Sequence, residues 1–322
     1  MPAAISVAGL RKSYGDLRAV DDVSFEIAEG EFFGILGPNG AGKTTTLEII
    51  EGLREPDGGD VRVVGMSPWP RNPALLPRIG VQLQASSFFE RLTAREQLRT
   101  FASLYGVPHR RADEMLETVG LTASAGTRTE KLSGGQAQRL SIACALVHSP
   151  EVLFLDEPTG ALDPQARRNL WDLLRAISAE GRTVVLTTHH LEEAELLCQR
   201  VAIMDHGRIL QTGPPAALIR DLDHPVQISL DSGQLSDQAR AEITALAEQP
   251  ATEPGQPASG LSQAVGGICG VTDNGTRLTV TTRAPAAVLA ALADDSALAG
   301  LSVNRATLED VFLHLTGREY RA

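Results

Sequence analysis

Gly37-Pro38-Asn39-Gly40-Ala41-Gly42-Lys43-Thr44 fits the phosphate-binding pattern G-x-x-x-x-G-K-[ST] at every fixed position. Its glycines allow backbone torsions that turn successive N–H groups inward around an anion. Lys43 can place a positive charge at the β- and γ-phosphates, and the Thr44 hydroxyl can complete the shell of a magnesium ion. The stretch therefore predicts a nucleotide phosphate-binding loop.

The sequence around this loop predicts an α/β fold. Residues 31–36 form a short apolar run typical of a buried strand, and residues 45–51 favour a helix whose N-terminus faces the phosphates. Further buried strands are expected at 152–155, 183–187 and 201–204, and helices at about 136–148, 164–180 and 191–198. Alternation of strand and helix predicts a mostly parallel sheet covered on both faces.

The two ends of the chain follow different patterns. Apolar and polar residues alternate from Ile5 to about Glu29, which predicts half-buried antiparallel strands. The composition changes after about residue 222, and a polar, Pro/Gly-rich stretch predicts a flexible loop at about 249–262. Asp273-Asn274-Gly275 is typical of a hairpin turn. We expect a domain over 1–222, with a helical subdomain at about 85–150, and a small α+β domain over 223–322.

Bulk composition limits the class of protein. A net charge of −11 over 322 residues argues against a nucleic-acid partner, which needs a basic face. No stretch approaches the roughly 18 consecutive apolar residues that span a bilayer. Cys144, Cys198 and Cys269 lie too far apart for a disulfide framework or a zinc site. The start of the chain lacks the pattern of a secretory signal. These features predict a soluble intracellular protein.

Two further segments carry candidate chemistry. Leu132-Ser133-Gly134-Gly135-Gln136 precedes an expected helix, where it is either an anion-binding surface or a plain serine cap. Asp156-Glu157 follows the expected strand at 152–155. Acidic residues at that end of a strand can face a metal held by phosphates, although a salt-bridged surface pair has the same pattern.

The order of these motifs, ending in Thr188-His189, resembles the nucleotide-binding subunit of ATP-binding cassette (ABC) transporters over about residues 5–220. The resemblance implies an ABC-type P-loop NTPase that binds ATP and Mg²⁺. Such a fold has a mostly parallel sheet, an antiparallel β subdomain and a helical subdomain, here followed by the small C-terminal α+β domain.

The resemblance also assigns binding residues. Tyr14 falls where the family stacks an aromatic ring on adenine, although a core tyrosine is the alternative. Gln84 matches the Q-loop glutamine that reaches magnesium or water; Gln82 is a rival, and we favour Gln84. The Walker A loop implied for the phosphates is Gly37, Pro38, Asn39, Gly40, Ala41, Gly42, Lys43, Thr44 and Thr45, with Thr44 on magnesium.

The catalytic roles follow from the same resemblance. Asp156 would hold magnesium through water, Glu157 would act as general base, and His189 would contact the γ-phosphate together with Lys43. Asp163 matches the dimer-crossing D-loop. The signature motif, expected to contact ATP held by the opposite subunit, is Ser133, Gly134, Gly135 and Gln136.

These roles imply partners. We expect a homodimer of ATPase subunits and a separately encoded integral-membrane permease, with this chain on the cytoplasmic face of a bacterial membrane. The segment from Gln84 to about Arg95, with Phe88, Phe89 and Leu92, is the candidate docking surface; ordinary core packing would give the same apolar cluster.

Residues 306–317 resemble the tail of the daunorubicin-resistance type and other exporters paired with ABC-2 type permeases, which implies export of a drug-like or hydrophobic compound. The alternative function is a soluble ABC-type ATPase in translation, repair or regulation, without a permease. A P-loop kinase would lack the signature motif and the Asp-Glu pair.

Overall fold

The computed structural model describes residues 3–82, 88–222, 224–247, 267–293, 300–317 and 320. Gln84 and the loop expected at about 249–262 lie outside these residues. The chain forms two compact units, of which the first joins Met1–Ala217 with Leu315–Ala322 and the second is Leu218–His314. The last residues of the chain thus belong to the first unit, a return that the sequence did not indicate. The expected domain division after residue 222 stays a prediction.

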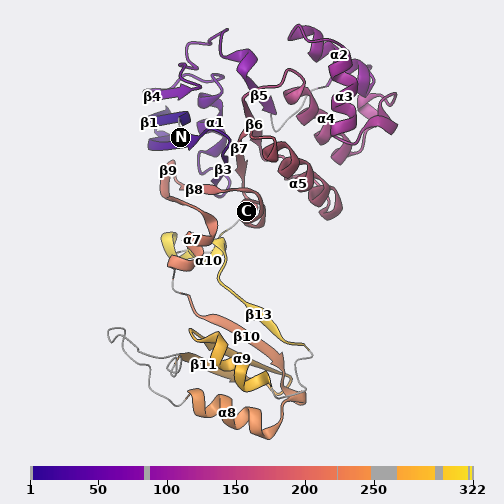
Figure 1. The fold of residues 1–322 in the computed structure, drawn as a ribbon. Coiled ribbons are helices and arrows are strands. Elements are labelled where there is room, and N and C mark those ends of the chain that lie inside the picture. Colours follow the sequence, from indigo (N-terminus) through magenta and orange to yellow (C-terminus); the bar gives the residue numbers. More distant parts are fainter. Residues whose placement is uncertain are drawn as a thin grey trace. The chain divides into compact units, whose positions relative to one another are not determined.

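A mostly parallel sheet organises the first unit (Figure 1). Its order is β5-β6-β7-β3-β8-β9, in which β9 runs antiparallel to β8 and the other neighbours are parallel. Strands β3 and β6 are buried along their whole length, as strands covered on both faces must be. The strands are β3 (Phe32–Leu36), β5 (Ile79–Gln82), β6 (Val152–Asp156), β7 (Thr183–Thr188), β8 (Arg200–Asp205) and β9 (Arg208–Gly213). The expected parallel sheet is confirmed.

An antiparallel sheet of order β2-β1-β4 packs against this sheet. It consists of β1 (Ala3–Tyr14), β2 (Leu17–Ala28) and β4 (Gly58–Val63). Alternate side chains such as Ile5, Val7 and Phe25 are buried and share one core with Phe33 and Phe154 of the parallel sheet. The alternation at the N-terminus therefore marked the antiparallel subdomain correctly.

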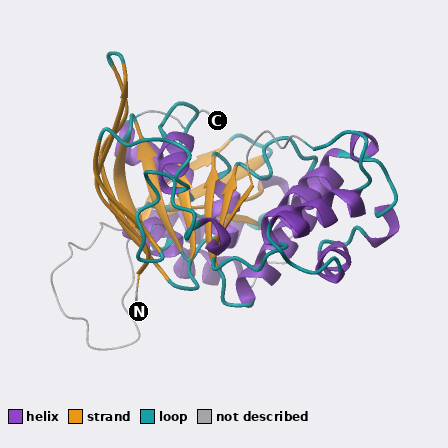
Figure 2. Ribbon diagram, turned by 90° about the horizontal axis from the view of Figure 1, so that it is seen from above, coloured by secondary structure: helices purple, strands orange, loops and turns teal. Residues whose placement is uncertain are grey.

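The helices of the first unit fall into two sets. A group of α2, α3 and α4 lies beside β5, to the right in Figures 1 and 2. Helix α1 follows β3, whereas α5 connects β6 to β7 and α6 connects β7 to β8. The bounds are α1 (Lys43–Ile50), α2 (Ala94–Leu104), α3 (Arg110–Thr118), α4 (Gly134–Leu146), α5 (Pro164–Ala179) and α6 (Leu191–Leu197). Helix α7 (Pro215–Asp221) begins in the first unit and ends in the second. Short 3-10 turns lie at Leu76–Arg78, Thr122–Ser124 and Thr129–Lys131.

The second unit has an antiparallel sheet of order β11-β12-β10-β13 with helices between its strands. The chain order β10, α8, β11, β12, α9, β13 is the split β-α-β-β-α-β arrangement. The expected hairpin turn joins β11 to β12, and Gly275 has a φ of 84° there. The bounds are β10 (Val226–Asp231), α8 (Asp237–Ala247), β11 (Ile268–Asp273), β12 (Arg277–Thr282), α9 (Pro285–Ala293), β13 (Ser302–Asn304) and α10 (Leu308–Thr316), with a 3-10 turn at Ser232–Gln234.

Candidate active site

The phosphate-binding loop connects the end of β3 to the first residue of α1. Gly42 precedes the helix with a φ of 101°, and a Cβ there would lie 2.2 Å from the carbonyl oxygen of Ala19. A Cβ on Gly37 would lie 2.1 Å from the carbonyl oxygen of Met204. These two positions require glycine because backbone from distant segments lies against them. The loop thus keeps its N–H groups at the N-terminus of α1, where an anion is stabilised.

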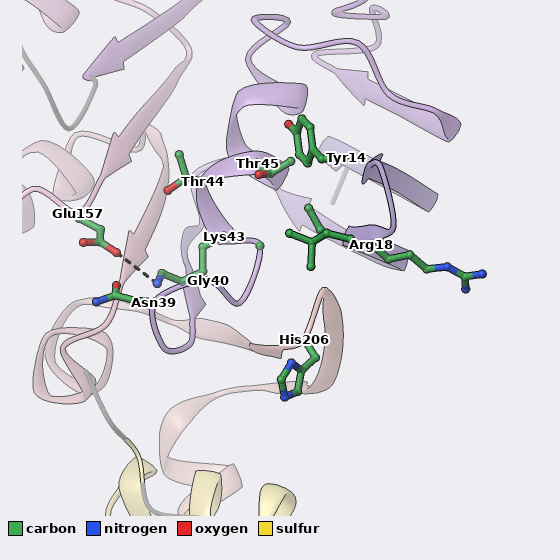
Figure 3. Close-up of a pocket in the computed structure, with 12 residues that line it drawn as sticks. Tyr14, Arg18, Asn39, Gly40, Lys43, Thr44, Thr45, Glu157 and His206 are labelled. Carbon is green, nitrogen blue, oxygen red and sulfur yellow. Dashed lines mark ion pairs between the residues drawn. The ribbon is translucent and has the colours of Figure 1, made fainter.

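Lys43 is buried inside this loop, with 4% of its surface exposed. Its Nζ donates to the carbonyl oxygens of Gly37 at 2.9 Å and Pro38 at 3.1 Å. The same ammonium forms an ion pair with Oε1 of Glu157 at 3.2 Å, drawn as a dashed line in Figure 3. A phosphate that binds to Lys43 here would have to replace these carbonyl and carboxylate oxygens as partners of its ammonium group.

Glu157 connects the loop to a histidine. Its second oxygen, Oε2, lies 3.0 Å from Nδ1 of His189. Glu157 has a φ of 45°, in the left-handed region that a residue with a side chain rarely adopts. Its N–H donates to the carbonyl and the hydroxyl of Thr187, each at 3.1 Å. Backbone strain of this kind is typical of functional sites, and here it aims the carboxylate at Lys43 and His189.

Asp156, the last residue of β6, is 5% exposed. The hydroxyl of Thr187 donates to its Oδ1, and the hydroxyl of Thr44 lies 3.3 Å from the same atom. Burial raises the pKa of Asp156, and the charge of Glu157 adds to the effect. The Glu157 side chain is 9% exposed, so the interpretation of this pair as a surface salt bridge is wrong.

The residues at Asp156 suit magnesium. Mg²⁺ prefers oxygen ligands and commonly takes one or two carboxylates together with water and substrate phosphates. The Thr44 hydroxyl on α1 and the Asp156 carboxylate at the end of β6 supply such oxygens, 3.3 Å from each other. The described residues include no group of three or more His, Cys, Asp or Glu side chains that could enclose a metal ion. The site therefore fits a cation that brings phosphate and water ligands with it.

Glu51 is a further acid near this position that sequence reasoning missed. It follows α1 and is 3% exposed. Burial raises the pKa of Glu51 to about 9, and the negative charge of Asp156 adds to this. Glu51 is therefore a neutral acid at physiological pH. No motif in the sequence marks it, because its state depends on what surrounds the end of α1.

A pocket of about 420 Å³ opens beside the loop (Figure 3). Tyr14 lies on its wall, 42% exposed, with the Arg54 guanidinium carbon 5.4 Å from its ring centre. The core alternative for Tyr14 is therefore wrong. The pocket is lined by Tyr14, Leu17, Arg18, Ala19, Asn39, Gly40, Gly42, Lys43, Thr44, Thr45, Glu157 and His206.

Leu17, Arg18, Ala19 and His206 were not expected at this pocket. The first three begin β2, separated by two residues from Tyr14 at the end of β1, so adjacency in sequence was the available signal. His206 comes from the β8–β9 turn, which is tied to the loop by a hydrogen bond from Gly207 N–H to the Ala41 carbonyl at 2.9 Å. That approach is a tertiary contact, so no local pattern could reveal it.

The signature segment lies elsewhere on the same unit. Ser133 is exposed and caps α4, accepting from Gln136 N–H, while the Gln136 side chain accepts from Ser133 N–H. Asp163 is exposed and caps α5. Among the described residues, the pocket lining includes neither Asp163 nor any residue from Ser133 to Gln136. The structure thus brings Glu157 into contact with Lys43 and His189, next to Asp156 in the chain, and leaves the signature motif outside the pocket that Lys43 and Glu157 line.

The remaining expectations concern the Q-loop. Gln82, the rival candidate, ends β5 and is 1% exposed, whereas Gln84 lies outside the described residues. Farther along the chain, a groove of about 660 Å³ is lined by Phe88, Phe89, Glu90, Arg91, Leu92 and Thr100. Phe89 is 58% exposed, so core packing does not account for this phenylalanine.

Comparison with known proteins decides the family. A family model described as ABC transporter matches residues 20–160, and one described as an AAA domain matches residues 129–195. The chain is 38% identical over 329 residues to Nod factor export ATP-binding protein I of Cupriavidus pinatubonensis, covering 100% of this chain and 93% of that protein. The chain belongs to the ABC transporter family. It is an ATP-binding subunit, an ATPase that energises a transporter.

Other ABC proteins agree with this assignment. The protein of the same name from Sinorhizobium fredii is 38% identical, covering 99% of this chain and 87% of its own length. Among solved structures, the dimeric MJ0796 cassette is 31% identical with a TM-score of 0.60, covering 65% of this chain and 98% of that one. The protein cbiO1 from Clostridium perfringens, part of the transporter complex cbiONQ, is 28% identical with a TM-score of 0.62 and covers 69% and 95%.

The ABC cassette fold of the first unit is thereby confirmed. Within the described parts of the chain, no helix has both the length and the apolar character needed to cross a bilayer.

Proposed function

We propose that this ABC subunit hydrolyses Mg-ATP at the cluster of Lys43, Asp156, Glu157 and His189. The observation that carries the proposal is the linked contact of Lys43 Nζ, the Glu157 carboxylate and His189 Nδ1, at 3.2 and 3.0 Å. A lysine, a buried acid and a histidine at the N-terminus of α1 are the groups that phosphoryl transfer to water needs.

The residues act in a definite order. Lys43 exchanges its carbonyl acceptors for the phosphates, while Tyr14 offers its ring face to the base. Release from Lys43 frees one oxygen of Glu157, which then accepts a proton from the attacking water as general base. His189 donates a hydrogen bond to the γ-phosphate. Thr44, Asp156 and Gln84 would hold Mg²⁺, which neutralises phosphate charge when bound.

The signature motif completes the site from a second copy of the chain. Ser133, Gly134, Gly135 and Gln136 stand at the N-terminus of α4, an anion-favouring position that lies outside their own subunit's pocket. A symmetric homodimer would place this helix end on the γ-phosphate held by the partner, with Asp163 crossing between subunits. Dimer closure and opening would then follow ATP binding and hydrolysis.

The permease is a separate chain. The groove at Phe88, Phe89 and Leu92 is the surface on which it would dock, on the cytoplasmic face of a bacterial membrane. The export names of the relatives favour export, and residues 306–317 resemble exporters of the daunorubicin-resistance type that pair with ABC-2 permeases. The cargo proposed on that resemblance is a drug-like or hydrophobic compound.

Co-expression with the genomic neighbours tests this function. The chain should co-purify from membranes with a multi-span protein, and the complex should hydrolyse ATP and move cargo out of the cell. Glu157→Gln should keep the complex and ATP binding but reduce turnover at least a hundredfold, since general-base catalysis contributes about 10²–10⁴-fold.

Recovery of the chain only as a free protein, with the neighbours present, would support the alternative of an ABC ATPase without a permease. A Glu157→Gln complex that hydrolyses ATP at the normal rate would contradict the role of Glu157.

A further inference from the structure

The end of the chain returns to the active site. Helix α10 ends at Thr316, and Leu315–Ala322 belong to the first unit although the residues before them belong to the second. Tyr320, the last described residue, is partly buried in the first unit, and its hydroxyl donates to the carbonyl oxygen of His189 at 3.0 Å. The tail therefore contacts the histidine that the site uses.

The peptide group between His189 and His190 is held at both ends: Tyr320 binds its carbonyl oxygen, and Thr188 binds its N–H. The carbonyl of His189 and the N–H of His190 belong to one planar unit. Tyr320 donates to its oxygen, and the Thr188 hydroxyl accepts from its N–H at 2.9 Å. Because the unit is planar, fixing both ends fixes the torsion that joins it to the His189 Cα. The position of the imidazole follows from that torsion and from its own rotamer.

The surroundings keep the phenol in its donor form. Burial raises the pKa of the Tyr320 hydroxyl, and the negative charge of Glu157 raises it further. The hydroxyl therefore stays protonated at physiological pH. Tyr320 and Glu157 both contact His189, the first at its carbonyl oxygen and the second at its Nδ1.

We propose that Tyr320 is a positioning residue for ATP hydrolysis: by holding the peptide after His189, it keeps the imidazole in place for Glu157 and the γ-phosphate. The inference rests on the proposed role of His189. In this role Tyr320 contacts neither the nucleotide nor the attacking water, so it affects the rate of the chemical step and not the affinity for ATP.

Tyr320→Phe tests the inference in the full-length chain, since it removes the hydroxyl and keeps the ring. Loss of one hydrogen bond that orders the site should lower kcat about two- to tenfold, with the KM for ATP unchanged. Tyr105→Phe is the matched control, because Tyr105 lies at the end of α2 and its ring stacks on that of His148. Its kcat should equal that of the wild type.

A double-mutant cycle separates positioning from general structural support. In a His189→Ala background, measured by single-turnover hydrolysis, Tyr320→Phe should cause no further loss. If His189→Ala is impaired but Tyr320→Phe has an unchanged kcat, the inference about Tyr320 is overturned and the role of His189 stands. An equal loss from Tyr320→Phe in the wild type and in His189→Ala would overturn it as well. Full turnover in His189→Ala would instead contradict the proposed role of His189.

Discussion

Single residues at this site carry charge states set by their surroundings. The rings of His189 and His190 lie 4.2 Å apart between their centres and are tilted by 46°. The Nε2 of His190 is buried and has no hydrogen-bond partner among the described residues. Burial, followed by the charges of His189 and Arg167, lowers the pKa of His190 to about 4. His190 is therefore neutral beside His189, so the two rings do not repel each other at physiological pH.

This lowered pKa predicts an acid-sensitive stability. Between pH 6.5 and about 4 the unfolded chain binds a proton at His190 that the folded chain does not, so the free energy of unfolding falls as pH falls through that window. Above pH 6.5 the effect is absent. His190→Phe should reduce this loss by about 1 kcal/mol, a modest figure because the ring is partly exposed.

Urea unfolding at pH 7.5 and pH 5 measures the effect, as the difference between the two values for each protein. His314→Asn, at an exposed position on α10, serves as the control and should keep the wild-type pH dependence. An equal pH-dependent loss in His190→Phe and the wild type would exclude His190 as the source.

At the scale of elements, two capped helix N-termini can be compared, at α4 and at α2. Ser133 caps α4 by accepting from Gln136 N–H, and Thr93 caps α2 in the same way by accepting from Glu96 N–H. Each cap satisfies N–H groups that a helix leaves open. The N-terminus of α4 is in addition the proposed contact for a partner's phosphate, whereas the N-terminus of α2 has no such role.

Two substitutions at Ser133 can separate these purposes. Ser133→Ala loses the cap and should cost about 1 kcal/mol of stability. Ser133→Asp keeps a good cap and should leave the melting temperature unchanged, yet it should suppress ATP turnover because it sets a negative charge against phosphate. Thermal melts and ATPase rates measure the two effects. As the control, Thr93→Ala on α2 should lose stability and keep its ATPase activity per folded molecule. Normal ATP turnover in Ser133→Asp would exclude the N-terminus of α4 from the site.

At the scale of the whole molecule, the signature motif is absent from the lining of the pocket in its own subunit, and in the proposed dimer each subunit would supply half of each site. A variant that binds ATP without hydrolysing it should therefore accumulate as a dimer. In sedimentation velocity, Glu157→Gln should shift from monomer to dimer when Mg-ATP is added, while the wild type should return to monomer as ATP is consumed.

Two controls locate the interface. Lys43→Ala should stay monomeric because it loses the phosphate charge pair, and Glu157→Gln combined with Ser133→Asp should fail to dimerise. A Glu157→Gln chain that binds ATP and remains monomeric would argue against the composite site.

Much of this molecule was predictable from short stretches of sequence. The phosphate loop, the β11–β12 hairpin and the start of α4 at Ser133 depend on torsions and hydrogen bonds among neighbours in the chain, so local residue types indicate them. Strand β5 and helix α8 were not predicted. Residues 79–82 are too short a run to show a period, and the mixed polar surface of α8 gives little contrast between its faces.

The sequence by itself predicted a phosphate-binding loop at Lys43 and placed Asp156 and Glu157 at the end of a buried strand. Only the tertiary structure decided which groups meet them. Strands β6, β7 and β3 are neighbours in the sheet, so their carboxyl ends bring Glu157, His189 and the loop of Lys43 to one edge. The tail adds Tyr320 to the same place from 131 residues beyond His189. Strand order and tail return depend on which apolar faces pack together across the whole chain, and no local pattern encodes that choice.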